Sequence, residues 1–323
     1  MLKLLQITLA ALWLVLQSAC TDVEQAEPLR IGFNPWPGYE FIYLAKVKGF
    51  YETNDIDVKL VELNALGDVR RAFERGQIDI MASTMVEVLI AAENTGRTLN
   101  IIAVSDSSNG SDMLLAHKPV TRVAELKGKR VGMEGATVDV LVAGAALRSA
   151  GLSFKDVDVV GKAQDDLVAD LEAGRVAAIE TYPPYAIQLM KSGRYNKIFD
   201  TAKIPGEIVD TIAVDAEVLA NRREDIDRFL EAYFQAFDYF SAHTEESSDI
   251  MGKREGISGA EFREAIAGME ILGRDAQAPY LLADGIGGQV LQRASDSLLA
   301  TGWLKAPADI AAFFVSDTGQ STR

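Results

Sequence analysis

The stretch that decides the fold is Arg30–Tyr51, "RIGFNPWPGYEFIYLAKVKGFY". Residues 29–33 are expected to form a strand, and an apolar helix is expected over residues 39–48, ended by a left-handed glycine. The turn between them reads Asn-Pro-Trp-Pro-Gly-Tyr. It places two large aromatic side chains beside the free amides of a helix start, where a small molecule could stack and accept hydrogen bonds.

The alternation of strand and helix continues outward from this stretch. Further strands are expected at 57–63, 78–82 and 100–104, with helices at 67–75 and 86–93, and the polar run 105–112 is expected to end the fourth strand. A second set follows, with strands at 130–133, 157–160 and 177–180 and helices at 138–149 and 165–173. This order predicts largely parallel sheets covered on both faces, in two α/β lobes.

Later segments read mostly as helices. Residues 224–242 carry apolar side chains at helical spacing, a stripe typical of a core helix, and residues 258–314 are expected to be mainly helical.

Length and charge exclude several classes of protein. The chain has 323 residues, which is too long for one compact core. Its formal net charge of -15 disfavours binding to nucleic acid or to anionic lipid, because both need a basic face. We therefore expect no nucleic-acid partner, and contact with a membrane only through an anchor.

The first residues predict export. Lys3 precedes an apolar run over residues 4–16, which is too short to span a bilayer comfortably and is typical of a secretory signal. The run leads to Leu-Gln-Ser-Ala-Cys, ending at Cys20, which resembles a bacterial lipobox, although Gln17 departs from the usual aliphatic residue. We predict a lipoprotein signal peptide over residues 1–19, lipidation of Cys20 and a tether over residues 20–29. Whether Gln17 impairs processing is left open.

Cysteine and histidine are scarce. Cys20 is the only cysteine, and His117 and His243 lie far apart in the sequence. An internal disulfide is excluded, and no metal site and no cofactor are expected.

In open α/β sheets, ligands bind beyond the carboxyl ends of the strands. Five turns are expected at those ends, and they are rich in Ser, Thr, Asn, Trp and Tyr: residues 34–39, 83–87, 105–112, 134–139 and 181–185.

These motifs and their order carry a resemblance. The segments "GFNPWPGYEFIYLAKVKGFY", "RAFERGQIDIMAS", "SDSSNGSDMLLAHKP", "LKGKRVGMEGATVDVLVAGAALRSAGL" and "DLEAGRVAAIETYPPYA", with "GWLKAPADIAAFF" near the end, resemble the NMT1/THI5-like family. The family includes solute-binding proteins of ABC importers for nitrate, sulfonates, taurine and pyrimidine precursors.

The resemblance implies a type II periplasmic-binding-protein fold of the α/β class, with a ligand cleft between two lobes. Lobe one would contain residues 30–117 and 211–323, and lobe two residues 118–210, with hinge crossings near Lys118 and Asp210. The ligand-binding residues implied by the matching motifs, together with the aromatic residue of the 181–185 turn, are Trp36, Gly38, Tyr39, Ser83, Thr84, Ser108, Asn109, Ala136, Thr137 and Tyr182.

Two departures bear on the ligand. Many family members read Thr-Trp-Glu-Pro-Tyr where this chain has Thr-Tyr-Pro-Pro-Tyr at residues 181–185. The candidate turns contain no Lys or Arg, but several acids lie in them or directly beside them: Glu40, Glu87, Asp106, Asp112, Glu134, Asp139 and Glu180. A neutral or cationic ligand, heteroaromatic or not, is therefore favoured over a small inorganic anion. The identity of the ligand stays open.

Three functional readings are weighed. We expect a monomeric, non-catalytic, lipid-anchored solute-binding protein in the periplasm that delivers a small molecule to an ABC permease. The same closed form could instead serve a membrane sensor. A pyrimidine-synthase-like enzyme of the same fold is the third reading, although no histidine lies near Trp36 in the sequence. The chain contains no Gly-x-Ser-x-Gly, His-Glu-x-x-His or phosphate-loop motif.

Overall fold

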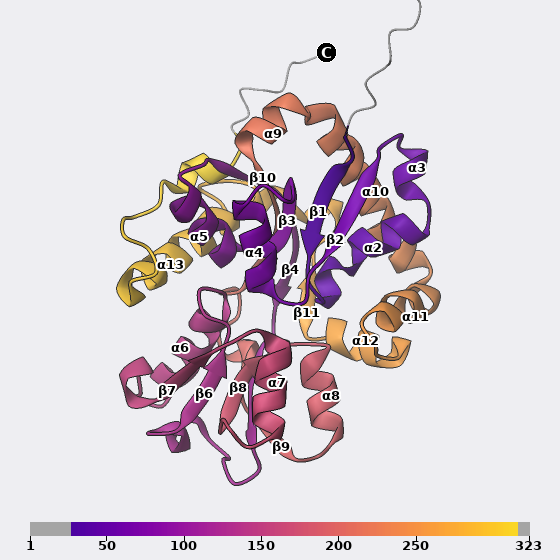
Figure 1. The fold of residues 1–323 in the computed structure, drawn as a ribbon. Coiled ribbons are helices and arrows are strands. Elements are labelled where there is room, and N and C mark those ends of the chain that lie inside the picture. Colours follow the sequence, from indigo (N-terminus) through magenta and orange to yellow (C-terminus); the bar gives the residue numbers. More distant parts are fainter. Residues whose placement is uncertain (1–26, 316–323) are drawn as a thin grey trace, which may run out of the picture.

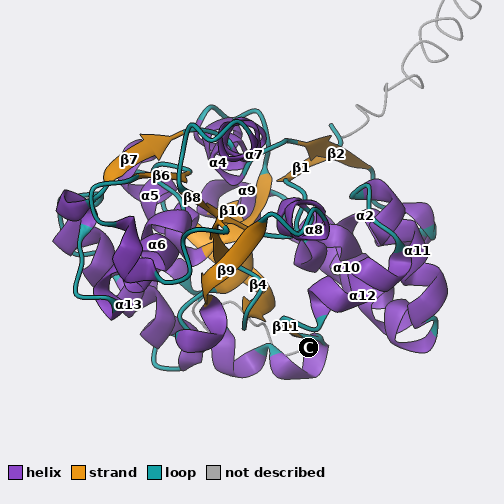
Figure 2. Cartoon of the chain, turned by 90° about the horizontal axis from the view of Figure 1, so that it is seen from below, coloured by secondary structure: helices purple, strands orange, loops and turns teal. Residues whose placement is uncertain are grey.

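The chain forms two β-sheets, each flanked by helices, as the computed structural model of residues 27–315 shows (Figure 1). Seen from below, helices lie on both sides of the strands (Figure 2). The chain thus has the α/β architecture that the alternating pattern predicted.

The first sheet has six strands. Their order is β11 (Met269–Ile271), β4 (Leu99–Ser108), β10 (Val209–Asp215), β3 (Ile80–Thr84), β1 (Leu29–Phe33) and β2 (Val58–Glu62). Strand β1 pairs in parallel with β2 and β3, whereas β10 lies antiparallel between β3 and β4. Strand β11 also pairs antiparallel with β4, so three of the five pairings in this sheet are antiparallel. The expectation of a largely parallel sheet is wrong here, because the late strands β10 and β11 join the sheet in the opposite direction.

The expected end of the fourth strand at residue 104 is wrong. Strand β4 continues to Ser108, and all ten of its residues are buried. Its polar end is held on both sides, because β10 and β11 both pair with it as far as Ser107. Polar composition alone did not end the strand, because neighbouring strands supply the hydrogen bonds.

The helices around the first sheet come from both ends of the chain. They are α2 (Glu40–Val47), α3 (Phe50–Thr53), α4 (Leu66–Glu74), α5 (Met85–Thr95), α9 (Ala216–Asn221), α10 (Arg223–Ala242), α11 (Thr244–Arg254), α12 (Gly259–Ile266) and α13 (Ile286–Thr301). The apolar stripe of α10 is buried against α2 and α3, which confirms that it belongs to the core.

The second sheet has five strands. Their order is β7 (Asp158–Gly161), β6 (Arg130–Met133), β8 (Ala178–Thr181), β5 (Met113–His117) and β9 (Tyr195–Asp200). Its helices are α6 (Asp139–Ser149), α7 (Gln164–Glu172) and α8 (Tyr185–Lys191). Short 3-10 helices lie at Pro37–Tyr39, Val123–Leu126, Phe154–Asp156, Thr201–Lys203, Arg274–Ala276, Ala278–Tyr280 and Ile310–Phe313.

The chain passes between the sheets twice. Strand β5 pairs with β8 and β9 of the second sheet, so the first crossing lies at residues 109–112, earlier than the expected hinge near Lys118. The return lies between β9 and β10, at residues 201–208, just before Asp210. We refer below to the part built on the first sheet as lobe one and to the part built on the second as lobe two.

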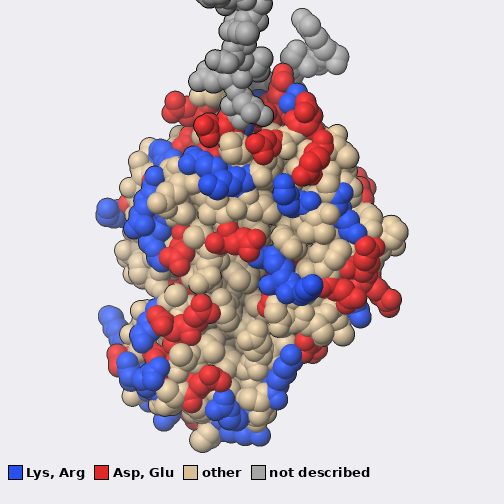
Figure 3. All heavy atoms as spheres, turned by 45° about the vertical axis from the view of Figure 1, so that its right-hand side comes forward, with Lys and Arg blue, Asp and Glu red and all other residues tan. Residues whose placement is uncertain are grey.

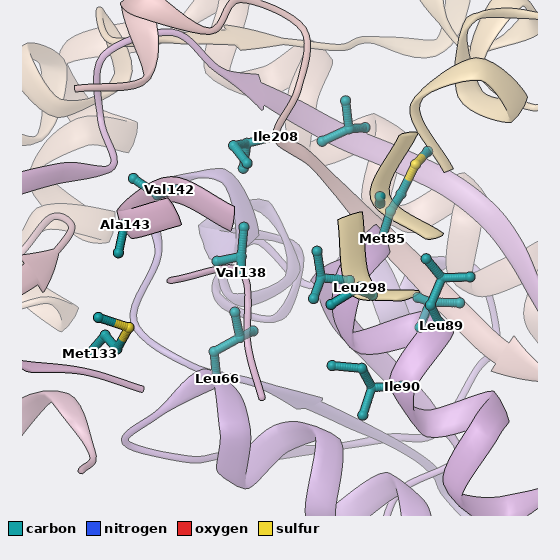
Figure 4. Packing of buried hydrophobic residues seen from close by; sticks show 14 of the residues in the cluster. Leu66, Met85, Leu89, Ile90, Met133, Val138, Val142, Ala143, Ile208 and Leu298 are labelled. Atoms are coloured by element: carbon teal, nitrogen blue, oxygen red, sulfur yellow. The ribbon is translucent and has the colours of Figure 1, made fainter. Parts of the chain in front are cut away.

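One apolar cluster joins the lobes on one side of the crossings. It includes Leu66 of α4, Val138 and Val142 at the start of α6, Ile208 of the return crossing and Leu298 of α13 (Figure 4). In the figure Val138 lies between Leu66 and Ile208. The cluster places the amino end of α6 directly against lobe one.

Candidate functional site

A small cavity lies where the two lobes meet. Its lining side chains come from turns at the carboxyl ends of strands, from the first crossing and from the starts of α4 and β10: Asn34, Trp36, Tyr39, Leu66, Thr84, Asp112, Val138, Tyr182 and Asp210. Its volume is about 10 Å³, which is space for about one water molecule. The lobes are therefore closed on each other.

The aromatic turn after β1 forms one wall of this cavity. Trp36 is buried, and its indole meets the Tyr182 ring edge-on at 5.9 Å between centroids. Its Nε1 donates to Asp106 Oδ2 at 3.1 Å. Gly38 makes this approach possible, since a Cβ there would lie 1.8 Å from Asp106 Oδ2. The turn thus holds Trp36 at the junction and Asp106 behind it.

The side-chain donors among the lining residues are all engaged. Tyr39 OH donates to Asp210, Tyr182 OH donates to Glu134 at 3.2 Å, and Thr84 Oγ1 donates to Glu87 at 2.5 Å. Asn34 Nδ2 donates to Tyr182 OH at 3.3 Å. Because the indole N–H of Trp36 also donates to Asp106, the lining offers no free side-chain donor.

Several acceptors of the same lining are free. Asn34 Oδ1, Asp112 Oδ2 and Asp210 Oδ2 are buried and have no hydrogen-bond partner. Asp210 also stands directly opposite Asp106 in the β4–β10 ladder, and like charges opposite each other in a sheet repel. The cavity is therefore rich in unpaired acceptor oxygen atoms.

Burial shifts the ionisation of these acids. Loss of hydration raises the pKa of Asp106 and of Asp112 to about 7. The pKa of Asp210 is raised well above its usual value by burial, and further by the charges of Asp106 and Asp112. Burial likewise raises the pKa of Glu87 to about 7.

Hydrogen bonds across the junction keep the lobes together. Glu87 of lobe one accepts from the Val138 amide at 2.8 Å, and Glu134 of lobe two accepts from the Gly67 amide at 3.2 Å. Near the rim, Tyr185 OH donates to the Asn64 carbonyl at 2.9 Å, and Lys191 pairs with Glu261. Carboxylates from each lobe thus bind amides of the other.

Four residues predicted for the site lie together around the cavity, and a fifth supports it. Trp36, Tyr39, Thr84 and Tyr182 line it, and Gly38 makes room for Asp106 behind Trp36.

Five others lie elsewhere. Ser83 is buried beneath the cavity, with its Oγ unpaired, and Ser108 Oγ bonds Thr201 Oγ1 at 2.8 Å beside the crossings. Thr137 Oγ1 donates to the Glu134 carbonyl at 2.9 Å. Asn109 is exposed, and Ala136 is half-buried with a positive φ of 59°. These five do not line the cavity.

Five lining residues were not predicted: Asn34, Leu66, Asp112, Val138 and Asp210. Asn34 and Asp112 stand in turns that the sequence singled out, so their position carried a signal. Asp210 had none, because its strand enters the sheet between β3 and β4 from far along the chain.

Residues 27–315 lack both metal-binding clusters and membrane-spanning helices. They contain no group of three or more His, Cys, Asp or Glu side chains arranged to hold a metal ion. In the same residues, every helix is too short or too polar to cross a membrane.

Comparisons with known proteins agree with this architecture. A Brucella abortus protein described as a binding protein is 24% identical over 313 residues, which are 90% of this chain and 91% of that one. The periplasmic aliphatic sulphonate-binding protein SsuA of Escherichia coli superposes with a TM-score of 0.75 at 19% identity, over 92% of this chain and 94% of that one. The periplasmic nitrate-binding protein NrtA of Synechocystis gives a TM-score of 0.71 at 16% identity, over 88% and 85%.

These structural similarities show that the chain has a periplasmic-binding-protein fold. The profile of the family described as NMT1/THI5 like matches residues 36–247, which run from the aromatic turn to the start of α11. Sequence and fold together establish that the chain belongs to the NMT1/THI5-like family.

Proposed function

We propose that this protein is a lipid-anchored solute-binding protein of the bacterial cell envelope, which captures a small molecule between its lobes and delivers it to an ABC permease. One observation carries the proposal. A cavity with aromatic and polar walls lies at the junction of two lobes that are joined by only two crossings. This is the arrangement in which closure of a hinge buries a ligand.

Access to the cavity requires the lobes to separate. At about 10 Å³ the closed cavity cannot admit a solute from outside. The bonds that would break on opening are few and mostly at the junction itself, such as Glu87 to Val138 and Glu134 to Gly67. A ligand that binds both walls would favour the closed form, which a permease can then recognise.

Relatives support transport over other roles. Proteins of this fold include sulphonate-binding and nitrate-binding proteins of the periplasm. We propose the same setting for this chain, as a monomer with a small-molecule ligand, no cofactor and no nucleic-acid partner. A membrane sensor would use the same closed form, and co-purification with a permease or with a receptor distinguishes these two partners.

Binding without catalysis fits the histidine positions. His117 Nε2 bonds the Leu171 carbonyl at 2.7 Å within lobe two, and its ring packs against Tyr195. It does not line the cavity beside Trp36. A pyrimidine-synthase-like reaction that consumes an active-site histidine is therefore not proposed.

The lipid anchor is tested separately, because Cys20 lies outside the described residues. Cys20→Ala is expected to stop incorporation of labelled palmitate and to release the protein from the membrane fraction. Labelling that persists in the variant would exclude Cys20 as the anchor.

The central experiment measures solute retained by the protein. Trp36→Ala removes the aromatic wall and is expected to lower the amount of co-purified solute by more than tenfold, as measured by mass spectrometry after denaturation. Trp303→Ala is the matched control, because Trp303 is 40% exposed and lies outside the cavity lining. Equal retention by both variants would remove Trp36 from the site.

A further inference from the structure

We propose that the cleft selects a compact organic cation carrying N–H groups, such as a protonated amine, an amidinium or a guanidinium, held by Asp112 and Asp210 against the rings of Trp36 and Tyr182. This inference rests on the solute-binding function proposed above and specifies the class of solute.

Hydrogen-bond complementarity is the first argument. The lining has three free buried acceptors, on Asn34, Asp112 and Asp210, while each of its side-chain donors already serves another group. Buried acceptors without partners are costly, and a ligand that brings N–H donors removes that cost. An oxyanion such as a sulfonate has only acceptors, so it would leave all three unpaired.

Charge is the second argument. Four carboxylates lie at or directly behind the cavity: Glu87, Asp106, Asp112 and Asp210. No Lys or Arg belongs to the described lining. A positive ligand would therefore be the only internal counter-charge for the Asp112 and Asp210 carboxylates, whereas an anion would be repelled by them.

Two largely buried cations of lobe one already form ion pairs. Arg70 of α4 pairs with Glu74, although its charge still reaches Glu87 and opposes the rise in the pKa of that acid. Arg254 of α11 pairs with Glu40 and Glu62. Neither guanidinium lines the cavity, although Arg70 Nε is buried without a hydrogen-bond partner.

The aromatic walls fit a cation as well. Tyr182 and Trp36 present rings to the same small space, and ring faces attract positive charge. An aromatic enclosure alone would also accept a quaternary ammonium group. The free oxygen atoms decide against it, because a quaternary nitrogen has no hydrogen to donate.

A second hollow, lined by residues of both lobes, is where an anion could bind instead of a cation. It has a volume of about 270 Å³ and is lined by Arg71 and Lys162 among others. These two cations pair with Asp68 and Asp170, respectively. On the face drawn in Figure 3, basic and acidic side chains are mixed, so that face does not draw anions in particular.

Two buried hydroxyl groups do not change the excess of free acceptors over free donors in the cavity lining. Ser83 Oγ and Thr181 Oγ1 have no partner, but neither belongs to the cavity lining. A hydroxyl can accept as readily as it donates, so both are compatible with an N–H ligand.

The experiment compares defined probes by calorimetry at pH 8. Putrescine, agmatine and guanidinium carry charge and N–H donors, choline carries charge without N–H donors, and ethanesulfonate and nitrate are the anionic comparison. We expect at least one N–H cation to bind at least 100-fold more tightly than choline, ethanesulfonate or nitrate. Tighter binding of ethanesulfonate or nitrate overturns the proposal, and so does a panel without a cationic binder.

Variants assign the binding to this cavity. Asp210→Asn and Asp112→Asn keep the shape of each side chain and are each expected to weaken cation binding by at least 100-fold. Asp170→Asn is the matched control, because Asp170 is an equally buried aspartate of lobe two that does not line the cavity, and it is expected to leave the affinity unchanged. Melting temperatures show that each variant is folded. Affinity that survives both cavity substitutions overturns the proposal.

A separate measurement keeps the two proposals apart. Protein purified without denaturation is unfolded in acid, and the released solute is identified by mass spectrometry. A basic nitrogen compound supports both proposals. A released sulfonic acid overturns the cation class and leaves solute binding intact, whereas no released solute together with no binding in a broad compound screen overturns both.

Discussion

Asp170 and Asp210 are buried to the same degree, with 2% of each residue exposed, but their surroundings are opposite. Asp170 of lobe two lies under two cations, Lys162 at 2.7 Å and Arg175 at 2.6 Å. Asp210 of lobe one faces Asp106 across the sheet and accepts one hydrogen bond, from Tyr39. Asp170 is covered by side chains of opposite charge, whereas Asp210 is surrounded by apolar and acidic groups.

The pKa of each acid follows from that difference. Hydrogen bonds from Lys162 and Arg175 lower the pKa of Asp170. Burial, and then Asp106 and Asp112, raise the pKa of Asp210 well above its usual value. A buried carboxylate that already has its counter-charge is part of the scaffold. One that lacks it, beside a cavity, indicates that the counter-charge comes from a ligand.

The largest expected effect is a loss of stability with rising pH in the solute-free protein. Burial raises the pKa of Glu87, Asp106 and Asp112 to about 7, so the folded protein holds these protons more tightly than the unfolded chain does. The stability that these bound protons contribute to the folded protein is fully present below about pH 4, and it is lost as the pH rises through about 7. Opening of the lobes, which rehydrates the acids, limits this loss.

Calorimetry between pH 5 and pH 8 is expected to show a melting temperature lower by roughly 5 to 10 °C at pH 8, and X-ray scattering a larger radius. The ionisable and charged side chains that face these acids belong to both lobes: Tyr39, Arg70, Glu134, Asp139, Glu180, Tyr182 and Asp210. A melting temperature that is flat or rises with pH would show that the cavity acids are compensated as Asp170 is.

The next effect concerns how Asp106 is held against its neighbours. Gly38→Ala would place a methyl group 1.8 Å from Asp106 Oδ2, so the carboxylate must move away from Trp36. Overpacking of this kind costs about 1 to 3 kcal/mol of unfolding free energy, and we expect solute affinity to fall at least tenfold.

Gly135→Ala is the control for that substitution, since its nearest neighbour would be the Trp303 ring at 4.0 Å. Thermal melts and calorimetric titrations of the two variants check the result. Similar behaviour of both would mean that Asp106 has room to move and that its pairing with Asp210 is not imposed by packing.

Local patterns predicted the parts of the fold that are local. Strand β1 and strand β6 have the expected bounds, and α6 begins one residue later than expected. The strand β10 left no comparable signal, because it takes its hydrogen bonds from β3 and β4, which lie far earlier in the chain. Its arrival also extends β4 through Ser105–Ser108, where composition alone favoured a loop.

The candidate site divides in the same way. Trp36 and Tyr39 could be predicted, because a strand, a glycine turn and a helix start are all visible in one short stretch. Ala136 and Thr137, just before the expected helix 138–149, were predicted to bind the ligand. In the structure the Val138 amide binds Glu87 from the other lobe, a contact between residues far apart in the sequence. The acids were visible in the sequence, but their lack of partners was not.

A smaller effect tests the two aspartates directly. Asp210→Asn replaces a buried carboxyl group that has no counter-ion, and the amide still accepts from Tyr39 while adding donors among free acceptors. We expect the solute-free variant to melt about 2 to 4 °C higher than the parent, which corresponds to roughly 1 kcal/mol. Asp170→Asn, which breaks two ion pairs, is expected to melt lower. A decrease in both would mean that the Asp210 charge is stabilised within the protein.

The smallest effect separates closure from charge. Tyr185 OH donates to the Asn64 carbonyl across the lobes at 2.9 Å, near solvent and outside the cavity lining. A net hydrogen bond contributes about 0.5 to 1.5 kcal/mol, and exposure places this one at the lower end, so Tyr185→Phe is expected to weaken solute binding about two- to threefold. Its effect should be the same at pH 6 and pH 8, as calorimetric titrations at both values would show. Tyr182→Phe, which removes a donor to Glu134, is expected to change the pH profile as well. If Tyr185→Phe also changed the pH profile, the pH dependence would come from closure of the lobes in general and not from the unpaired acids of the cavity.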